Sequence, residues 1–412
     1  MFKPLDYQIE MAKQGYAVLK QYGIVYLAGE ERVRKTLPAI MITNMCSNVK
    51  HVLVITMKEP IKGWKHHLSN YNTNAIFTVC NFHSAHKFLD LEPDLVIIDE
   101  AHNCIGGFPK KSQINKRIST ITKGLPLIYI SATPHAQGYS SLYHQFSLSS
   151  WSPWKRYKNF LAWFKDYGIP ETVYVQSVAR PVYTNTIESM VKADTDHLFI
   201  TKKRQDVGFE HEPEDKVHHV ELNDSTLMLY NTLIKKRLYT FKNGLELVCD
   251  TASKLRFALH MIEGGTFIIR SIELNKNCKP KDVRHYYQLP NTEKIDYIKQ
   301  KWGDTKDLVI FYYYKEEKRK LEKHFKNAKI LQSTTHAEGI DLWEYETVVV
   351  YSQDWRTAKY TQRRARQTSL NRTTPIIVHY LLVKGAVSDQ CYQTVAINKQ
   401  NFVDSRFTEE EI

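Results

Sequence analysis

The chain has 412 residues, 42% of them hydrophobic, with no apolar run near the roughly 18 residues of a membrane span and no signal-peptide core, so we expect a cytoplasmic protein. Its length predicts two domains of about 200 residues each, and its six scattered cysteines predict reduced thiols rather than a zinc site or disulfide framework. A surplus of 57 basic over 44 acidic residues gives a net charge of +13, which favours a polyanion as partner. Nucleic acid is the commonest such partner, and charge does not separate DNA from RNA.

A phosphate-binding loop is predicted near the N-terminus. A buried-strand run over residues 24–28 is followed by the loop 29–36 and then by a helical pattern. In such a loop the backbone amides and the helix N-terminus face the phosphates, Lys35 reaches the outer phosphates, and the Thr36 hydroxyl meets magnesium. Arg34 stands where glycine normally precedes the lysine, and its side chain is expected to crowd the phosphates. An ordinary strand-turn-helix with a charged turn is the alternative.

Two acids end the next strongly apolar run. Residues 95–98 are typical of a strand buried on both faces, and Asp99, Glu100 and, after one alanine, His102 follow. Because ligands bind at the carboxyl ends of parallel strands, these acids are expected at the edge of a site. Asp99 can hold magnesium while Glu100 orients or deprotonates an attacking water. The alternative is a strand followed by a polar turn.

Further strands are expected at residues 51–56, 76–79 and 127–130. The last of these runs into Ser131-Ala132-Thr133-Pro134, whose hydroxyls can hydrogen-bond the acidic neighbour and sense the state of the phosphate. In isolation, a plain turn is the preferred interpretation of this tetrapeptide.

Residues 137–168 are dense in aromatic side chains, with basic residues such as Lys155 interleaved. A mixture of this kind can stack on bases or line a nucleic-acid channel. Because large aromatics mostly pack, we favour the core of a helical hairpin under the first domain.

The second half has its own α/β rhythm. We divide the chain into a first domain at 1–212, a linker and helical segment at 213–285 and a second domain at 286–412. Strands are expected at 217–222, 308–312, 329–331 and 347–351, and helices at 225–239, 294–301 and 315–325. This alternation predicts a second parallel sheet with crossover helices. Lys235 and Lys236 are candidates for phosphate contacts, and a solvated helix face explains them equally well.

Three segments in order resemble the motifs of a known family. Residues 29–36, Asp99-Glu100-Ala101-His102 and residues 131–134 look like motifs I, II and III of the DEAH-box motors of helicase superfamily two. The Swi/Snf-type branch is indicated by Tyr7-Gln8, Leu27 to Glu30, Trp64 and Phe199 to Val207. Residues 308–311, 337–342 and 362–369 are similar to motifs IV, V and VI. The resemblance spans nearly the whole chain and is to compact phage and prophage members of the branch.

The resemblance implies an α/β fold with two RecA-like parallel-sheet domains in tandem, a helical insertion between motifs, and ATP and magnesium as cofactors. The implied nucleotide contacts are Gln8, which reads adenine, Gly29, Lys35, Thr36 and Asp341, with Thr36 and Asp99 on magnesium. The implied catalytic residues are Lys35, Asp99, Glu100, Arg366 and Arg363. Coupling between nucleotide and motion is assigned to His102, Ser131, Thr133, Gly339 and Gln362. Nucleic-acid candidates are Trp64, Lys155, Lys235 and Lys236.

Motif VI departs from the pattern, since Ser369 replaces its second arginine. That arginine usually stabilises charge on the transferred phosphoryl group, so either Arg366 serves alone or Arg363 or Arg372 substitutes. The implied function is an ATP-dependent DNA translocase or helicase acting on duplex or branched DNA, in the host cytoplasm if the protein is phage-encoded. One alternative is a helicase that separates strands of DNA or RNA. Another, suggested by Arg34 and Ser369, is a nucleic-acid-binding module whose ATPase has decayed.

Overall fold

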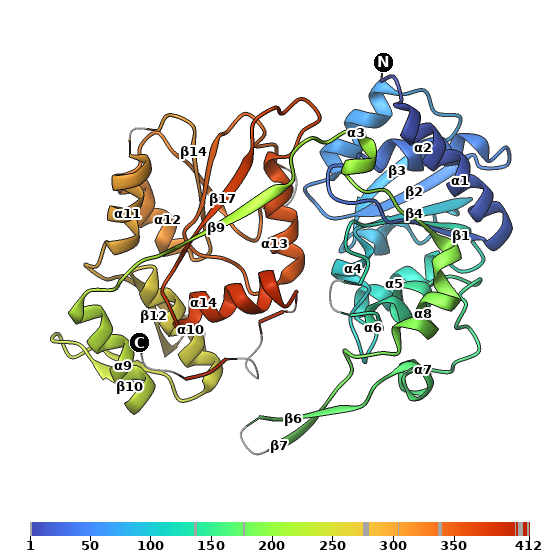
Figure 1. Ribbon diagram of the computed structural model, residues 1–412. Coiled ribbons are helices and arrows are strands. Elements are labelled where there is room, and N and C mark those ends of the chain that lie inside the picture. The colour runs from blue at the N-terminus through green and yellow to red at the C-terminus, as the bar shows by residue number, and fades with distance from the viewer. Residues whose placement is uncertain are drawn as a thin grey trace. The chain divides into compact units, whose positions relative to one another are not determined.

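The computed structural model describes residues 2–135, 138–175, 178–274, 280–303, 305–336, 340–399, 401–402, 407–409 and 412. The chain divides into two compact units, Met1–Glu210 and His211–Ile412 (Figure 1). Each unit is built on its own parallel sheet with helices on both faces. None of the helices within the described ranges is long and apolar enough to cross a membrane.

The first unit contains a six-stranded parallel sheet in the order β3-β2-β4-β5-β1-β8. Its strands are β1 (Ile24–Leu27), β2 (His51–Thr56), β3 (Ile76–Asn81), β4 (Leu95–Asp99), β5 (Leu127–Ile130) and β8 (Phe199–Ile200). Successive residues of a strand alternate between two buried clusters: Ile24 and Tyr26 belong to one, and Val25 and Leu27 to the other. Because both faces are covered, the central strands are apolar throughout.

Different helices cover the two faces of this sheet. The Val25 face packs against α1 (Asp6–Tyr22), α2 (Thr36–Met45) and α3 (Ile61–Asn70). The Tyr26 face packs against α4 (Ala101–Cys104), α5 (Gln113–Ile121), α6 (Ser140–Phe146), α7 (Phe160–Tyr167) and α8 (Glu188–Thr195). Trp154, Phe160 and Trp163 are at most 2% exposed inside this second layer. The aromatic segment therefore packs as core, as favoured from the sequence.

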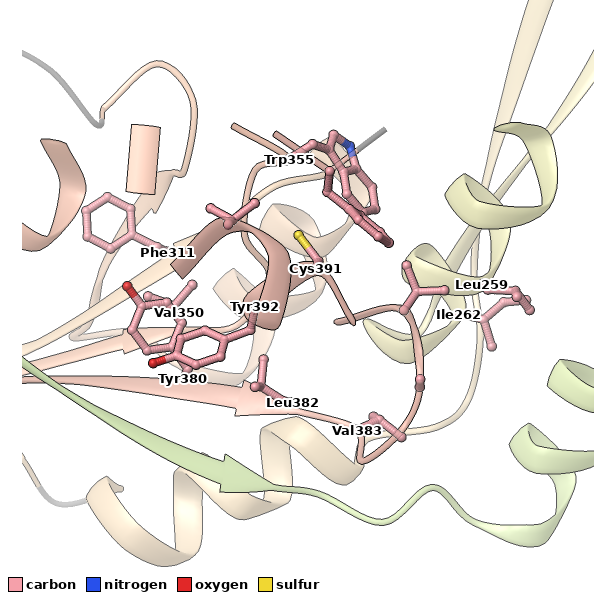
Figure 2. Packing of buried hydrophobic residues seen from close by; sticks show 14 of the residues in the cluster. Leu259, Ile262, Phe311, Val350, Trp355, Tyr380, Leu382, Val383, Cys391 and Tyr392 are labelled. Carbon is pink, nitrogen blue, oxygen red and sulfur yellow. The ribbon is translucent and has the colours of Figure 1, made fainter. Parts of the chain in front are cut away.

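The second unit contains a five-stranded parallel sheet in the order β15-β14-β16-β17-β9. Its strands are β9 (Pro213–His219), β14 (Leu308–Tyr312), β15 (Lys329–Gln332), β16 (Thr347–Val350) and β17 (Ile376–Leu382). One face packs on α11 (Glu293–Trp302) and α12 (Lys315–His324), and the other on α9 (Asp224–Lys236), α10 (Ala252–Glu263), α13 (Thr357–Arg364) and α14 (Val387–Tyr392). Figure 2 shows the second face, where Phe311, Val350 and Tyr380 of the strands lie near Cys391 and Tyr392 of α14.

The predicted fold class, two RecA-like parallel-sheet domains in tandem, is the fold observed. The segment 213–285, treated from sequence as linker and helices, differs in detail because β9 is the edge strand of the second sheet. The same segment contains the short antiparallel pair β10 (Leu238–Thr240) and β11 (Glu246–Val248). A longer hairpin follows, of β12 (Thr266–Leu274) and β13 (Pro280–Gln288), and the first unit has a further hairpin of β6 (Glu171–Val175) and β7 (Val178–Val182).

A buried polar network fixes the base of the β12–β13 hairpin. Gly264 and Gly265 join α10 to β12, and a Cβ on either would overlap Glu317 or Lys320 of α12. The Glu317 carboxylate accepts hydrogen bonds from two backbone amides after β14 and from Ser352, and Lys320 donates to three backbone carbonyls, including those of Gly265 and Leu289. Burial raises the pKa of Glu317 to about 7 and lowers the pKa of Lys320 to about 8.

Candidate nucleotide site

The carboxyl ends of three strands are level at one edge of the first sheet. Ile130, the last residue of β5, is opposite Leu27 at the end of β1 and opposite Asp99 at the end of β4. Neighbouring strands are about 4.8 Å apart, so the loop after β1 and the acids after β4 leave the sheet about 10 Å apart, with Ser131 between them. The fold thus brings together the loop, the acid pair and the hydroxyl-rich turn.

The loop after β1 folds around the Lys35 ammonium group. Lys35 Nζ donates to the carbonyls of Gly29 at 2.6 Å and Glu30 at 2.9 Å. The helix α2 begins at the next residue, Thr36, so its first-turn amides lie beside the ammonium group. A helix N-terminus and a lysine at the same place attract an anion such as phosphate.

Carboxylates surround the same lysine. Burial lowers the pKa of Lys35, and the negative charges of Glu100, Glu31 and Asp99 oppose that shift by favouring the ammonium form. The acids after β4 therefore act electrostatically on the loop after β1. This coupling is the physical link between the two halves of the site that the sequence gives separately.

Two residues of the loop have a left-handed backbone conformation. Arg32 has φ of 71° and Arg34 has φ of 53°. A non-glycine residue there costs about 1–2 kcal/mol, which explains why phosphate-binding loops favour glycine at the position of Arg34. The Arg34 side chain is exposed, and the expectation that it crowds the phosphates stays a prediction. The replacement of glycine by Arg34 therefore affects this loop through the backbone conformation of that residue.

The N-terminal turn of α1 contacts the loop. The Gln8 side chain donates from Nε2 to the carbonyl of Arg34 at 3.1 Å, and its Oε1 accepts from the Leu5 amide at 3.0 Å. The Tyr7 hydroxyl donates to the carbonyl of Val33 at 3.3 Å. Gln8, assigned from sequence to adenine, thus also holds the backbone of the residue that replaces glycine.

Two donors fix the Asp99 carboxylate. Its Oδ2 accepts from the Thr56 hydroxyl, at the end of β2, and from the indole Nε1 of Trp64 on α3, each at 2.8 Å. Trp64 is 2% exposed. The assignment of Trp64 as a nucleic-acid contact is therefore wrong in this structure, because a buried indole offers no face to a base. Its role here is to position a carboxylate.

The second acid and the hydroxyl-rich turn are joined through a histidine. Glu100 has a left-handed backbone, with φ of 54°, and its Oε2 lies 3.4 Å from Nδ1 of His102. The same Nδ1 lies 2.8 Å from the Ser131 hydroxyl, whose oxygen accepts from the Thr133 amide at 3.0 Å. A movement of the turn after β5 therefore changes the surroundings of Glu100.

The segment after β8 adds contacts that the sequence did not single out. Arg204 Nη1 lies 3.2 Å from Oε2 of Glu31, and the Arg204 amide donates to Oε2 of Glu30 at 2.8 Å. The Glu30 amide in turn donates to the carbonyl of Lys202. The sequence offered one signal, the family-like segment Phe199 to Val207, but nothing in it identified the two glutamates as its partners.

In the second unit, motifs V and VI are adjacent. Nη1 of Arg366 donates to the carbonyl of Ile340 at 3.5 Å, and the Leu342 amide donates to the Arg366 carbonyl at 3.1 Å. Asp341, between these two contacts, is exposed. Gly339 lies outside the described residues. Gln362 is 3% exposed, one turn before Arg366.

The other two arginines near motif VI are enclosed. Arg363 is 1% exposed, with its guanidinium 5.9 Å from the ring centre of Phe311 and 5.8 Å from that of Tyr380. Arg372 donates to four backbone carbonyls, including those of Trp343 and Tyr345. Both guanidinium groups are thus held inside the second unit, and the catalytic roles assigned to Arg363, Arg366 and Arg372 stay predictions.

The donor set fits ATP with magnesium. Hydroxyl and carboxylate oxygens, here from Thr36 and Asp99, are the ligands that Mg²⁺ prefers, and protein sites hold it by one or two carboxylates together with substrate phosphates. Over the described ranges, no group of three or more His, Cys, Asp or Glu side chains is placed to hold a metal ion. Bound Mg²⁺ would neutralise phosphate charge there.

The remaining nucleic-acid candidates lie on the surface. Lys155 is exposed after α6, and Lys235 and Lys236 are exposed in the last turn of α9. Their exposure is compatible with phosphate contacts and equally with a solvated helix end.

No protein-family model and no curated protein matches the chain. Among solved structures, the chain is similar to a Sulfolobus solfataricus SWI2/SNF2 ATPase core in complex with dsDNA, at 15% identity and a TM-score of 0.43, over 96% of this chain and 91% of that chain. It is also similar to a Sulfolobus solfataricus SWI2/SNF2 ATPase core domain, at 13% identity and a TM-score of 0.41, over 98% of this chain and 93% of that chain. With identities and TM-scores this low, we infer function from the residues themselves.

Proposed function

We propose that the chain is an ATP-dependent DNA translocase or helicase of the Swi/Snf-like type, which couples ATP hydrolysis to movement on DNA and remodels duplex or branched DNA. The observation that carries the proposal is the level alignment of Leu27, Ile130 and Asp99 at the edge of one parallel sheet, because the loop that contains Lys35 follows Leu27 and Ser131 follows Ile130. The net charge of +13 supports a polyanionic partner.

Each residue of the site has a separate role in ATP hydrolysis. Lys35 and the first turn of α2 bind the outer phosphates, and Thr36 with Asp99 holds magnesium. Glu100 orients the attacking water and accepts its proton. Arg366 is the candidate for supplying positive charge to the transferred phosphoryl group. The contact from His102 to Ser131 transmits the state of Glu100 to the turn after β5.

A strand-separating helicase on DNA or RNA is the nearest rival, and a binding module with a decayed ATPase is the second. Decay is suggested by the strained backbone of Arg34 and by Ser369. Against decay, Asp99 keeps two hydrogen-bond donors, and Lys35 lies among carboxylates that favour its charged form. A nucleotide site that had lost its function would not be expected to keep both arrangements.

The test compares ATP turnover of the purified chain without nucleic acid and with single-stranded DNA, duplex DNA, a branched junction and RNA. We expect duplex or branched DNA to stimulate turnover most. Strongest stimulation by RNA would favour the RNA helicase. Absence of turnover with every substrate, followed by a large gain in Arg34→Gly or Ser369→Arg, would favour decay.

A further inference from the structure

The β12–β13 hairpin of the second unit has one face with basic and aromatic residues. Residues 266–288 include five basic and two acidic residues. In the register, Arg270 is opposite Arg284 and Ile268 is opposite Tyr286. Directly opposite residues of an antiparallel pair share a face, and residues two apart on a strand do so as well, so all four lie on one face.

The arginine pair is unfavourable by itself. Like charges directly opposite one another destabilise a hairpin, because their Cβ atoms are only about 5 Å apart. Both Arg270 and Arg284 are exposed, and the register places Asp282, opposite Ile272, on the same face. A phosphate between two guanidinium groups would turn this repulsion into two charge-assisted contacts.

The aromatic part of the face opens into a pocket of about 320 Å³. The pocket is lined by Ile268, Arg284 and Tyr286 of the hairpin, by Phe257 of α10, and by Tyr313 and Lys315 after β14. Tyr286 is 41% exposed, and its ring touches no other aromatic ring of the described chain. Glu316 also lines the pocket, where it forms an ion pair with Arg319 at 2.7 Å and accepts a hydrogen bond from Gln288 at 3.5 Å.

Buried contacts hold the base of this face. Its base is tied to the second sheet through the buried contacts of Lys320 with the carbonyls of Gly265 and Leu289, on either side of the hairpin. Further out on the same face, Ile272 is 80% exposed, so apolar surface is available beyond the arginines as well. Exposed cations, an open aromatic ring and apolar surface are the features with which proteins bind an unpaired nucleic-acid strand.

We propose that this hairpin face and its pocket bind single-stranded DNA, with a phosphate between Arg270 and Arg284 and a base against the ring of Tyr286. A single strand fits better than a duplex, because only unpaired bases offer their faces for stacking. The proposal rests on the proposed function, since it takes DNA as the partner. It adds a binding site in the second unit for the single strand that is exposed at a branch.

The experiment measures binding of a labelled single-stranded DNA oligonucleotide by fluorescence anisotropy, without nucleotide triphosphate, over a range of salt concentrations. Arg270→Ala/Arg284→Ala is compared with Lys301→Ala/Lys318→Ala, a control with the same change of charge on exposed helical positions. We expect the arginine variant to bind more weakly and to lower the slope of log K against log salt by about 0.7, as the loss of one neutralised phosphate on a single strand requires. The control keeps the wild-type slope.

Tyr286→Ala is expected to weaken binding about 5- to 150-fold, and Tyr286→Phe to restore most of it because the ring remains. Arginine variants no weaker than the control, or equal losses in the two Tyr286 variants, would overturn the proposal. Tighter binding of duplex DNA or of RNA, with the same losses, would overturn the choice of single-stranded DNA. Because the assay contains no ATP, it reports on the hairpin even if the chain hydrolyses none.

Discussion

Arg34→Gly tests whether backbone strain is built into the phosphate-binding loop. A non-glycine residue in the left-handed region costs about 1–2 kcal/mol of folding free energy, which glycine avoids. Glycine also makes the unfolded chain more flexible, and this cancels about 0.5–1 kcal/mol of the gain. With φ of 53° at Arg34 and an exposed side chain that contributes little packing, we expect the free energy of unfolding to rise by about 0.5–1 kcal/mol. Urea denaturation followed by circular dichroism measures it.

The chain offers two matched controls for this substitution. Arg34→Ala removes the charge but keeps a Cβ, so it should not gain stability. Glu92→Gly changes an exposed residue with φ of 47° outside the site, so it should gain similar stability without altering the KM for ATP. In Arg34→Gly, by contrast, we expect the KM for ATP to change. The Arg34 carbonyl accepts the hydrogen bond from Gln8, so a change in the backbone at this residue alters both that contact and the loop. If Arg34→Gly and Arg34→Ala are equally stable, the strain argument is refuted.

Three further predictions concern the carboxylates and their partners. Trp64→Phe removes a donor to Asp99, so we expect a loss of about 1.5–3 kcal/mol in unfolding free energy and a higher magnesium requirement for ATP hydrolysis; an unchanged magnesium titration would argue against the contact. Ser131→Ala should lower the ratio of ATPase rates with and without DNA, and an unaltered ratio would show that its contact with His102 carries no coupling. The pKa of Glu317 is raised from 4.5 to about 7, so between these pH values the folded state binds more protons than the unfolded state, and the free energy of unfolding falls by about 3 kcal/mol as pH rises. Glu317→Gln should remove this dependence on pH. A slope that persists in the variant would refute the assignment.

The central strands could be predicted from sequence because burial on both faces leaves a continuous apolar run, as in residues 95–98. The edge strand β9 (Pro213–His219) was predicted only in part, at residues 217–222, since its first residues are charged and no continuous apolar run marks where it begins. The β12–β13 hairpin was missed for a similar reason. Its residues pair with one another rather than with a sheet, so only the short apolar run Phe267-Ile268-Ile269 marks it.

The loop, the acids and the hydroxyl-rich turn could be predicted because their chemistry lies in short local motifs. The side chains that hold them could not, because those contacts are tertiary. Thr56 and Trp64 reach Asp99 from other elements, and the sequence gives no period or spacing that connects them. The same limit applies to Arg363, whose burial against Phe311 depends on how α13 rotates over the sheet.

The central claim is that Glu100 activates water for ATP hydrolysis at this site. Its most direct test is the DNA-stimulated hydrolysis rate of Glu100→Gln, measured together with ATP binding. We expect binding to be retained and turnover to fall by about 10²- to 10⁴-fold, the usual contribution of a general base. Turnover equal to that of the wild-type chain would contradict the account.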